Sequence, residues 1–115
     1  MKTLNSALAV LAASFALNTY AADQALISKG EYLTRAADCV ACHVAPGGKP
    51  YAGGLSFKLP FGTLYSPNIT PDKETGIGNW TDDEFVSALQ KGVGKDGKHY
   101  YPAFPYTSYT LMPRE

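Results

Sequence analysis

The stretch Cys39-Val40-Ala41-Cys42-His43 decides how this chain must fold. Its two thiols are three residues apart, so one helical turn brings them to the same side of the backbone, and an imidazole follows directly. This spacing is typical of c-type haem attachment, in which each thiol forms a thioether with a vinyl group of the porphyrin and the histidine faces the iron. The pentapeptide therefore predicts one covalent haem c, with Cys39 and Cys42 as attachment points and His43 as an iron ligand.

Three other interpretations fit the cysteine pair less well. A structural zinc site needs four ligands, and outside the pentapeptide the chain offers only His99 and no further cysteine. A thioredoxin-like redox pair follows a strand and opens a helix, whereas a helical pattern leads into Cys39. A non-haem binding module held by a Cys39–Cys42 disulfide would leave His43 and the many aromatic residues without a role.

The N-terminus has the organisation of an export signal. A positively charged start, Met1-Lys2-Thr3, precedes the largely apolar residues 4–17, and Thr19 and Ala21 are small enough for a signal peptidase site. We therefore expect residues 1–21 to be a signal peptide. The apolar run is short for a membrane span, so the mature chain is expected in the bacterial periplasm.

The overall composition points to one small domain, expected over residues 22–115. Of the 115 residues, 45% are hydrophobic and 17% are charged, with ten acidic and ten basic side chains. This balance is typical neither of a disordered chain nor of a nucleic-acid-binding surface, so no nucleic-acid partner is expected. A domain this short is marginally stable unless a cofactor or a crosslink supplements its core.

The first part of the domain is expected to be one helix followed by a long loop. Residues 23–38 have apolar or small side chains at roughly helical spacing, and Asp23 is placed to cap the first amides. Gly30 weakens such a helix and hints that another backbone packs closely there. Residues 45–75 interleave prolines with glycines, and no convincing strand pair appears. The sequence therefore predicts a mostly α-helical domain with long Pro/Gly loops.

A second helix is expected after Thr81, which forms a capping box with Glu84, and Gly92 should end it. Residues 92–97 spell G-x-G-x-x-G, but a dinucleotide site needs that string after a strand and before a helix. Here the string closes a helix, so nucleotide binding is not expected.

The aromatic and proline run at residues 100–106 suits neither a regular helix nor a central strand, and it is expected to wrap around a flat group.

The iron of an electron-transfer haem takes a sixth ligand from the face opposite the histidine, and a thioether is a common choice. Met112 is the one methionine besides Met1, and it follows the aromatic run by a few residues. Met112 is therefore the expected sixth ligand, with His99 as its rival. With both iron faces occupied, no coordination position is open for chemistry, so the chain is expected to transfer electrons rather than to catalyse a reaction.

Polar partners are also expected around the haem. The second ring nitrogen of His43 should donate to a carbonyl, and Pro46 and Pro50 offer candidates in the following loop. Donors for the haem propionates are available on three residues that are equally suited to ordinary core or turn roles, namely Tyr65, Asn68 and Trp80.

Taken together, these motifs resemble a known family, the multihaem cytochrome c subunits of bacterial membrane-bound alcohol, gluconate and related sugar dehydrogenases. Besides the pentapeptide, the resemblance is carried by residues 30–33, 45–50, 66–72, 75–80 and 101–106. The most particular strings among these are Asn68-Ile69-Thr70-Pro71 and Pro102-Ala103-Phe104-Pro105-Tyr106. The resemblance covers nearly all of the mature chain.

The resemblance implies a small class I cytochrome c-like domain, the first of three haem domains in a subunit at the outer face of the cytoplasmic membrane. Electrons would pass from the catalytic subunit of a dehydrogenase towards membrane ubiquinone, with quinone or a further cytochrome as the electron partner. Membrane association would then come through the complex rather than through this segment. A free periplasmic monohaem shuttle remains an alternative.

Two features of the chain depart from this family. Some relatives carry a methionine where Phe104 stands, which leaves Met112 as the candidate ligand. In class I cytochromes c a final helix begins near that position, whereas this sequence ends at Glu115. We therefore expect the final helix to be missing and the haem domain to be incomplete at its C-terminus.

Overall fold

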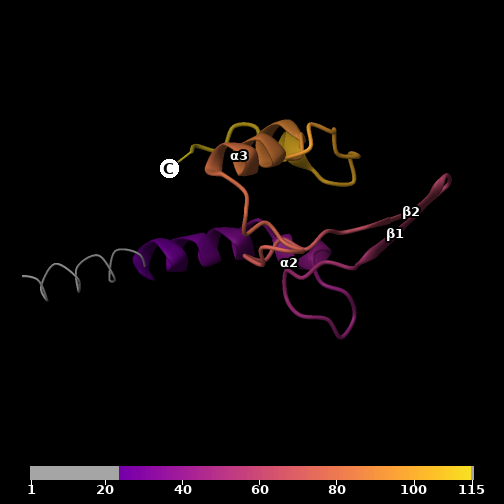
Figure 1. The fold of residues 1–115 in the computed structure, drawn as a ribbon, viewed down its shortest axis with the longest axis horizontal. Coiled ribbons are helices and arrows are strands. Elements are labelled where there is room, and N and C mark those ends of the chain that lie inside the picture. The colour runs from indigo at the N-terminus through magenta and orange to yellow at the C-terminus, as the bar shows by residue number, and fades with distance from the viewer. Residues whose placement is uncertain (1–23, 115) are drawn as a thin grey trace, which may run out of the picture.

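The computed structural model of the chain describes residues 24–114. The expected signal peptide, residues 1–21, and the expected capping residue Asp23 lie outside these described residues. In chain order the elements are a helix over residues 24–36, α2 (Cys39–Cys42), β1 (Ser56–Leu59), β2 (Gly62–Tyr65), α3 (Asp82–Lys91) and the 3-10 helix η1 (Tyr106–Ser108), as Figure 1 shows.

The described residues form two halves that face each other (Figure 1). The motif half, residues 24–79, holds the first helix, α2 and the hairpin of β1 and β2, which projects to one side. The α3 half, residues 80–114, holds α3 and η1, which pack against each other. A hydrogen bond of 3.3 Å from the Tyr109 hydroxyl to the Ala37 carbonyl oxygen joins the two halves.

The first helix ends earlier than the sequence predicted. It stops at residue 36, Asp38 adopts a left-handed conformation with φ 54°, and Cys39–Cys42 forms the separate turn α2. Aspartate tolerates this conformation better than most residues other than glycine, so the break falls on a suitable side chain. The His43 amide donates to the Cys39 carbonyl oxygen at 3.1 Å, and the pentapeptide therefore still forms one helical turn.

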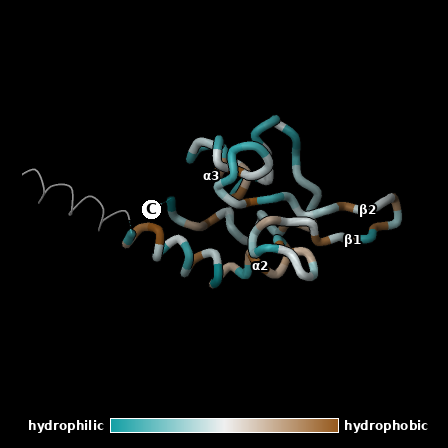
Figure 2. Tube along the Cα trace, turned by 60° about the horizontal axis from the view of Figure 1, so that its bottom comes forward, coloured by the Kyte–Doolittle hydropathy of each residue, from teal (hydrophilic) through white to brown (hydrophobic). Residues whose placement is uncertain are grey.

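The helix over residues 24–36 keeps its apolar side exposed. Leu26 and Ile27 are 67% and 60% exposed, and Figure 2 shows hydrophobic colour at the start of this helix. Within residues 24–114 nothing lies within 4 Å of a Cβ atom built on Gly30, so the close backbone approach expected there is not found. No helix in the described part of the chain is long and apolar enough to cross a bilayer.

The expectation that the chain has no strand pair is wrong. β1 and β2 pair antiparallel, with Ser56 opposite Tyr65 and Leu59 opposite Gly62. Pro60 and Phe61 connect them, and proline at the second position with glycine at the fourth suits a tight four-residue turn. Such short strands are hidden in the sequence by the surrounding proline and glycine. The prediction of a mostly α-helical domain is therefore only partly right: within residues 24–114, three α-helices, the 3-10 helix η1 and one hairpin are joined by long loops.

The second helix is confirmed with both of its ends. The Thr81 hydroxyl accepts a hydrogen bond from the Glu84 amide at 3.2 Å, and the Glu84 carboxylate accepts one from the Thr81 amide at 2.8 Å. Gly92 ends α3 with φ 66°. The G-x-G-x-x-G string therefore closes a helix, as expected, and its last glycine, Gly97, donates its amide to the Gly94 carbonyl oxygen in a turn.

Replacing Thr81 by alanine should lower the free energy of unfolding by about 1 kcal/mol, because the Glu84 amide loses its acceptor at the start of α3. Urea unfolding followed by circular dichroism measures the change. Thr107→Ala, at an exposed position of η1, is the matched control and should stay within about 0.5 kcal/mol of the parent. Equal unfolding midpoints for the two variants would contradict the capping role.

Candidate haem site

A cavity of about 220 Å³ lies between the two halves, and we call it the crevice. The groups most relevant to its chemistry come from both halves: Cys39, Cys42 and His43 from the motif half, and Leu89, Phe104 and Tyr109 from the α3 half. The structure thus brings the three residues of the attachment motif together and sets apolar and aromatic side chains opposite them.

Both cysteines stand as half-buried free thiols. Burial raises the pKa of the Cys39 thiol, a backbone hydrogen bond lowers it in part, and the neighbouring Asp38 and Cys42 raise it further. A redox-active cysteine of the thioredoxin kind needs a lowered pKa, because the thiolate is its nucleophile. The surroundings of Cys39 therefore do not favour the redox-pair interpretation.

His43 is oriented by a backbone carbonyl. Its Nδ1 atom lies 2.8 Å from the carbonyl oxygen of Pro67, so that the Nδ1–H donates and Nε2 is left for a metal. Pro46 and Pro50 were the expected acceptors, and that expectation is wrong: the acceptor lies 24 residues beyond His43. Histidine chemistry predicts that a carbonyl accepts from the ring. Which carbonyl does so depends on which distant loop the fold brings next to His43.

Gly53 explains how Pro67 reaches the imidazole. The Gly53 amide donates to the His43 carbonyl oxygen at 2.9 Å, and the Gly54 amide donates to the Ser66 carbonyl oxygen at 2.8 Å. Gly53 is buried with φ 75°, and a Cβ atom there would overlap the carbonyl group of Pro67. Only glycine lets these backbones approach so closely.

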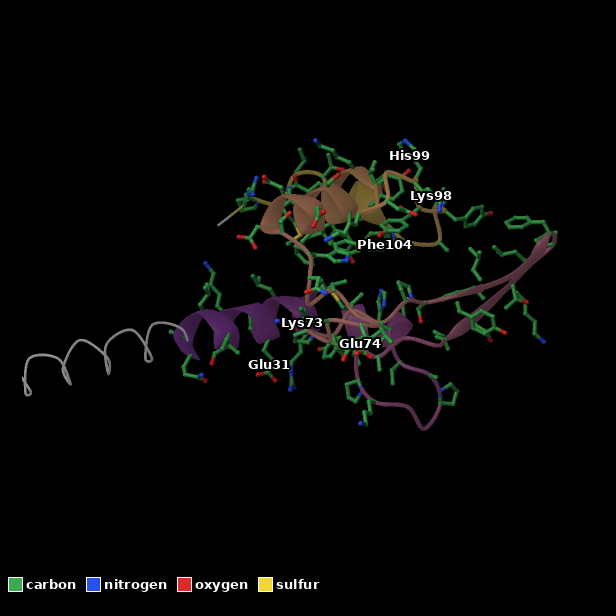
Figure 3. The ribbon with its side chains drawn as sticks, viewed as in Figure 1. Glu31, Lys73, Glu74, Lys98, His99 and Phe104 are labelled. Carbon is green, nitrogen blue, oxygen red and sulfur yellow. The ribbon has the colours of Figure 1, made fainter. Side chains whose placement is uncertain are left out.

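The rings of Phe104 and Tyr109 line the crevice on the side of the α3 half, and Phe104 also packs near two further tyrosine rings. The Phe104 ring lies 5.9 Å from that of Tyr100, 6.4 Å from that of Tyr106 and 6.0 Å from that of Tyr109, measured between centroids. Figure 3 shows Phe104 on the side of the α3 half that faces the motif half. Burial raises the pKa of the Tyr109 hydroxyl, which therefore stays protonated and remains a donor to Ala37. The sequence predicted that the aromatic run at residues 100–106 contacts a flat group, but it did not show that Phe104 is the ring of this run that lines the crevice.

The two candidate sixth ligands, Met112 and His99, are not among the residues that line the crevice. Met112 is half-buried. Its carbonyl oxygen accepts from Gln90 Nε2 at 2.7 Å and its amide donates to the Tyr109 carbonyl oxygen at 3.0 Å. His99 is exposed, pairs with Val93 in an isolated bridge, and lies on the outer side of the α3 half in Figure 3.

The proposed propionate donors do not line the crevice either. Tyr65 is 67% exposed at the end of β2. The Asn68 side chain forms hydrogen bonds with Thr70 and Thr75 in its own loop. Trp80 lines a different and more open hollow of about 440 Å³, together with Lys95 and Tyr100. The structure thus gives these three side chains ordinary surface, turn and packing positions.

The residues of the crevice fit a haem c. Two thiols on one helical turn supply thioether positions, and an imidazole anchored through Nδ1 presents Nε2 as a ligand. Opposite them, Leu89 and Phe104 offer an apolar surface of the kind that a porphyrin face requires.

Comparison with known proteins gives close relatives but no match to any family model. The chain is 54% identical over 110 residues to the cytochrome c subunit of alcohol dehydrogenase (quinone) from Gluconobacter oxydans strain 621H, an alignment of 95% of this chain and 23% of that protein. It is 50% identical over 115 residues to the gluconate 2-dehydrogenase cytochrome c subunit of Pantoea cypripedii, covering 97% of this chain and 26% of the relative. A diheme cytochrome c-type protein of Cereibacter sphaeroides is 45% identical over 87 residues, which are 71% of this chain and 29% of that protein.

Motif, crevice and relatives agree on the class: the chain is a c-type cytochrome. More particularly, its relatives are the cytochrome c subunits of alcohol, gluconate and fructose dehydrogenases, which are electron-transfer components rather than catalytic subunits. The chain spans about a quarter of the length of these relatives, 23% and 26% for the first two.

Proposed function

We propose that this chain carries one covalently bound haem c and passes single electrons within a dehydrogenase complex, from its catalytic subunit towards quinone or a further cytochrome. One observation carries the proposal: Cys39, Cys42 and His43 all line the same crevice, and the His43 imidazole is oriented by a hydrogen bond to the Pro67 carbonyl oxygen. The relatives support the setting, since they are cytochrome c subunits of dehydrogenases and one of these enzymes is described as quinone-dependent.

In this proposal, the residues of the crevice have the following roles. Cys39 and Cys42 hold the cofactor, and His43 binds its iron through Nε2. When bound, haem c supplies a one-electron couple between ferric and ferrous iron. Leu89 and Phe104 keep water from the crevice wall, and the protein controls the reduction potential partly through this exclusion of solvent.

We also propose that the chain works in the periplasm. With residues 1–21 acting as a signal peptide, the haem domain would lie in the periplasm. We expect it at the outer face of the cytoplasmic membrane, bound there through its complex.

Expression of the full chain together with cytochrome c maturation proteins tests the function. The dithionite-reduced alkaline pyridine spectrum should show haem c, and the ratio of haem to protein should be one. A colourless exported chain would contradict the proposal, and a ratio of two would contradict the single haem. Copurification with a dehydrogenase catalytic subunit distinguishes a complex from a free periplasmic shuttle.

Met112 remains our proposed sixth ligand. Its support is its half-buried position and a 3.0 Å hydrogen bond from its amide to the backbone carbonyl oxygen of Tyr109, a residue that lines the crevice. Met112→Leu keeps most of the side-chain volume and removes the sulfur. The red charge-transfer band of ferric haem with a sulfur ligand should therefore disappear in Met112→Leu and persist in His99→Ala. Persistence of the band in Met112→Leu would assign the sixth position to another residue.

A further inference from the structure

The carbonyl that holds His43 is itself held by the loop that follows it. The Pro67 carbonyl and the Asn68 amide belong to one planar peptide unit, so anything that fixes the backbone of Asn68 also fixes the direction of this carbonyl. The proline ring restricts φ on the other side. The orientation of the His43 imidazole therefore depends on Asn68, although the two side chains share no hydrogen bond within the described structure.

The Asn68 side chain is locked by three hydrogen bonds. Its Oδ1 accepts from the Thr70 amide at 2.9 Å and from the Thr70 hydroxyl at 2.7 Å, while its Nδ2 donates to the Thr75 hydroxyl at 2.9 Å. Because a backbone amide can only donate, Oδ1 must face Thr70, and the amide orientation is unambiguous. Both ends of the side chain are engaged, which leaves its peptide plane little freedom to rotate.

The Thr75 hydroxyl connects Asn68 to Asp72. It accepts from Asn68 Nδ2 and donates to Asp72 Oδ1 at 2.9 Å, and the same carboxylate oxygen accepts from the amides of Thr75 and Glu74 at 2.6 and 3.0 Å. The hydrogen bond from the Thr75 amide is the main cause that lowers the pKa of Asp72. The carboxylate is therefore charged at neutral pH and acts as an acceptor there.

Backbone contacts hold the two ends of this loop. The Ile69 amide donates to the Tyr51 carbonyl oxygen at 2.9 Å, and the Ile77 amide donates to the Thr70 carbonyl oxygen at 2.9 Å. Figure 3 shows Lys73 and Glu74, which lie in this loop, in the half of the molecule that carries the attachment motif. The hydrogen bonds thus join the exposed part of the loop to the imidazole through Asn68 and Pro67.

We propose that Asn68, Thr75 and Asp72 form a positioning network that holds the Pro67 carbonyl on His43 and thereby sets the reduction potential of the iron; this inference rests on the proposed function. A firm hydrogen bond from Nδ1–H makes the imidazole a stronger electron donor, and a stronger donor stabilises ferric iron. Loosening the network weakens that bond, so the midpoint potential moves to a more positive value. The three residues are positioning residues, because none of them touches the metal.

Thr75→Val is the decisive variant, because it removes the shared hydroxyl at an exposed position and keeps the branched shape of the side chain. Thr75→Ser restores a hydroxyl, and Thr63→Val makes the same change at an exposed position of β2. The haem-loaded full chains are compared by potentiometric titration. Proton exchange at His43 Nδ1, followed by NMR on the ferrous forms, reports the hydrogen bond directly.

We expect a positive shift of potential and faster Nδ1 proton exchange in Thr75→Val, and parental values in Thr75→Ser and Thr63→Val. Asn68→Ala should show a larger shift in the same direction, because the Thr70 contacts are lost as well. Parental potential and exchange in both Thr75→Val and Asn68→Ala overturn the inference. A colourless parent chain ends the proposed function, and this inference with it, whereas a red parent with unshifted variants ends the inference alone.

Discussion

Replacing Cys39 and Cys42 together by serine should abolish covalent attachment of haem completely. Serine hydroxyls do not add to vinyl groups as thiols do, and no other cysteine is present in the sequence. Acid–acetone extraction followed by haem staining on a denaturing gel and mass measurement of the intact chain will show the loss. Without the cofactor, the crevice residues lose their partner, so the unfolding temperature should also fall.

The two single serine variants are the internal controls for this result. Each keeps one thiol on the α2 turn and should retain haem through one thioether, at reduced yield. Haem that withstands extraction from the double variant would show that Cys39 and Cys42 are not the attachment points. It would also remove the basis for His43 as the ligand.

Replacing Gly53 by alanine should destabilise the protein by about 2–4 kcal/mol. About 1–2 kcal/mol comes from placing a side chain at φ 75°, and the rest from overlap between the new methyl group and the Pro67 carbonyl. The displaced carbonyl should also lose its hydrogen bond to His43, so the variant should show fast exchange at His43 Nδ1 as well as a lower urea midpoint.

Gly47→Ala separates the two contributions. Gly47 has nearly the same φ, 74°, but nothing lies within 4 Å of a Cβ atom built there. This control should therefore show only the conformational cost, about 1–2 kcal/mol, and an unchanged His43 signal. If the two glycine variants lose equal stability, the contact between Gly53 and Pro67 has no energetic weight.

The features that the sequence predicted correctly have short-range causes. The capping box of α3 needs only Thr81 and Glu84 at a fixed spacing, and the glycine end of the helix follows from the need for a left-handed residue at Gly92. The expectation of one helix over residues 23–38 failed at its C-terminal end. There the left-handed conformation of Asp38 separates α2 from the first helix, and no periodic pattern marks such a break.

By itself the sequence determined the cofactor chemistry of this protein, because thiol spacing and the following imidazole act within a single turn of Cys39–Cys42. Only the tertiary structure decided that Pro67 rather than Pro46 or Pro50 orients His43, and that Leu89, Phe104 and Tyr109 line the crevice. These outcomes depend on backbone hydrogen bonds and packing between residues that are distant along the chain. The spacing of residues within one segment does not show which distant segment a proline-rich loop will contact. The residues that contact the haem motif are therefore decided by the tertiary structure.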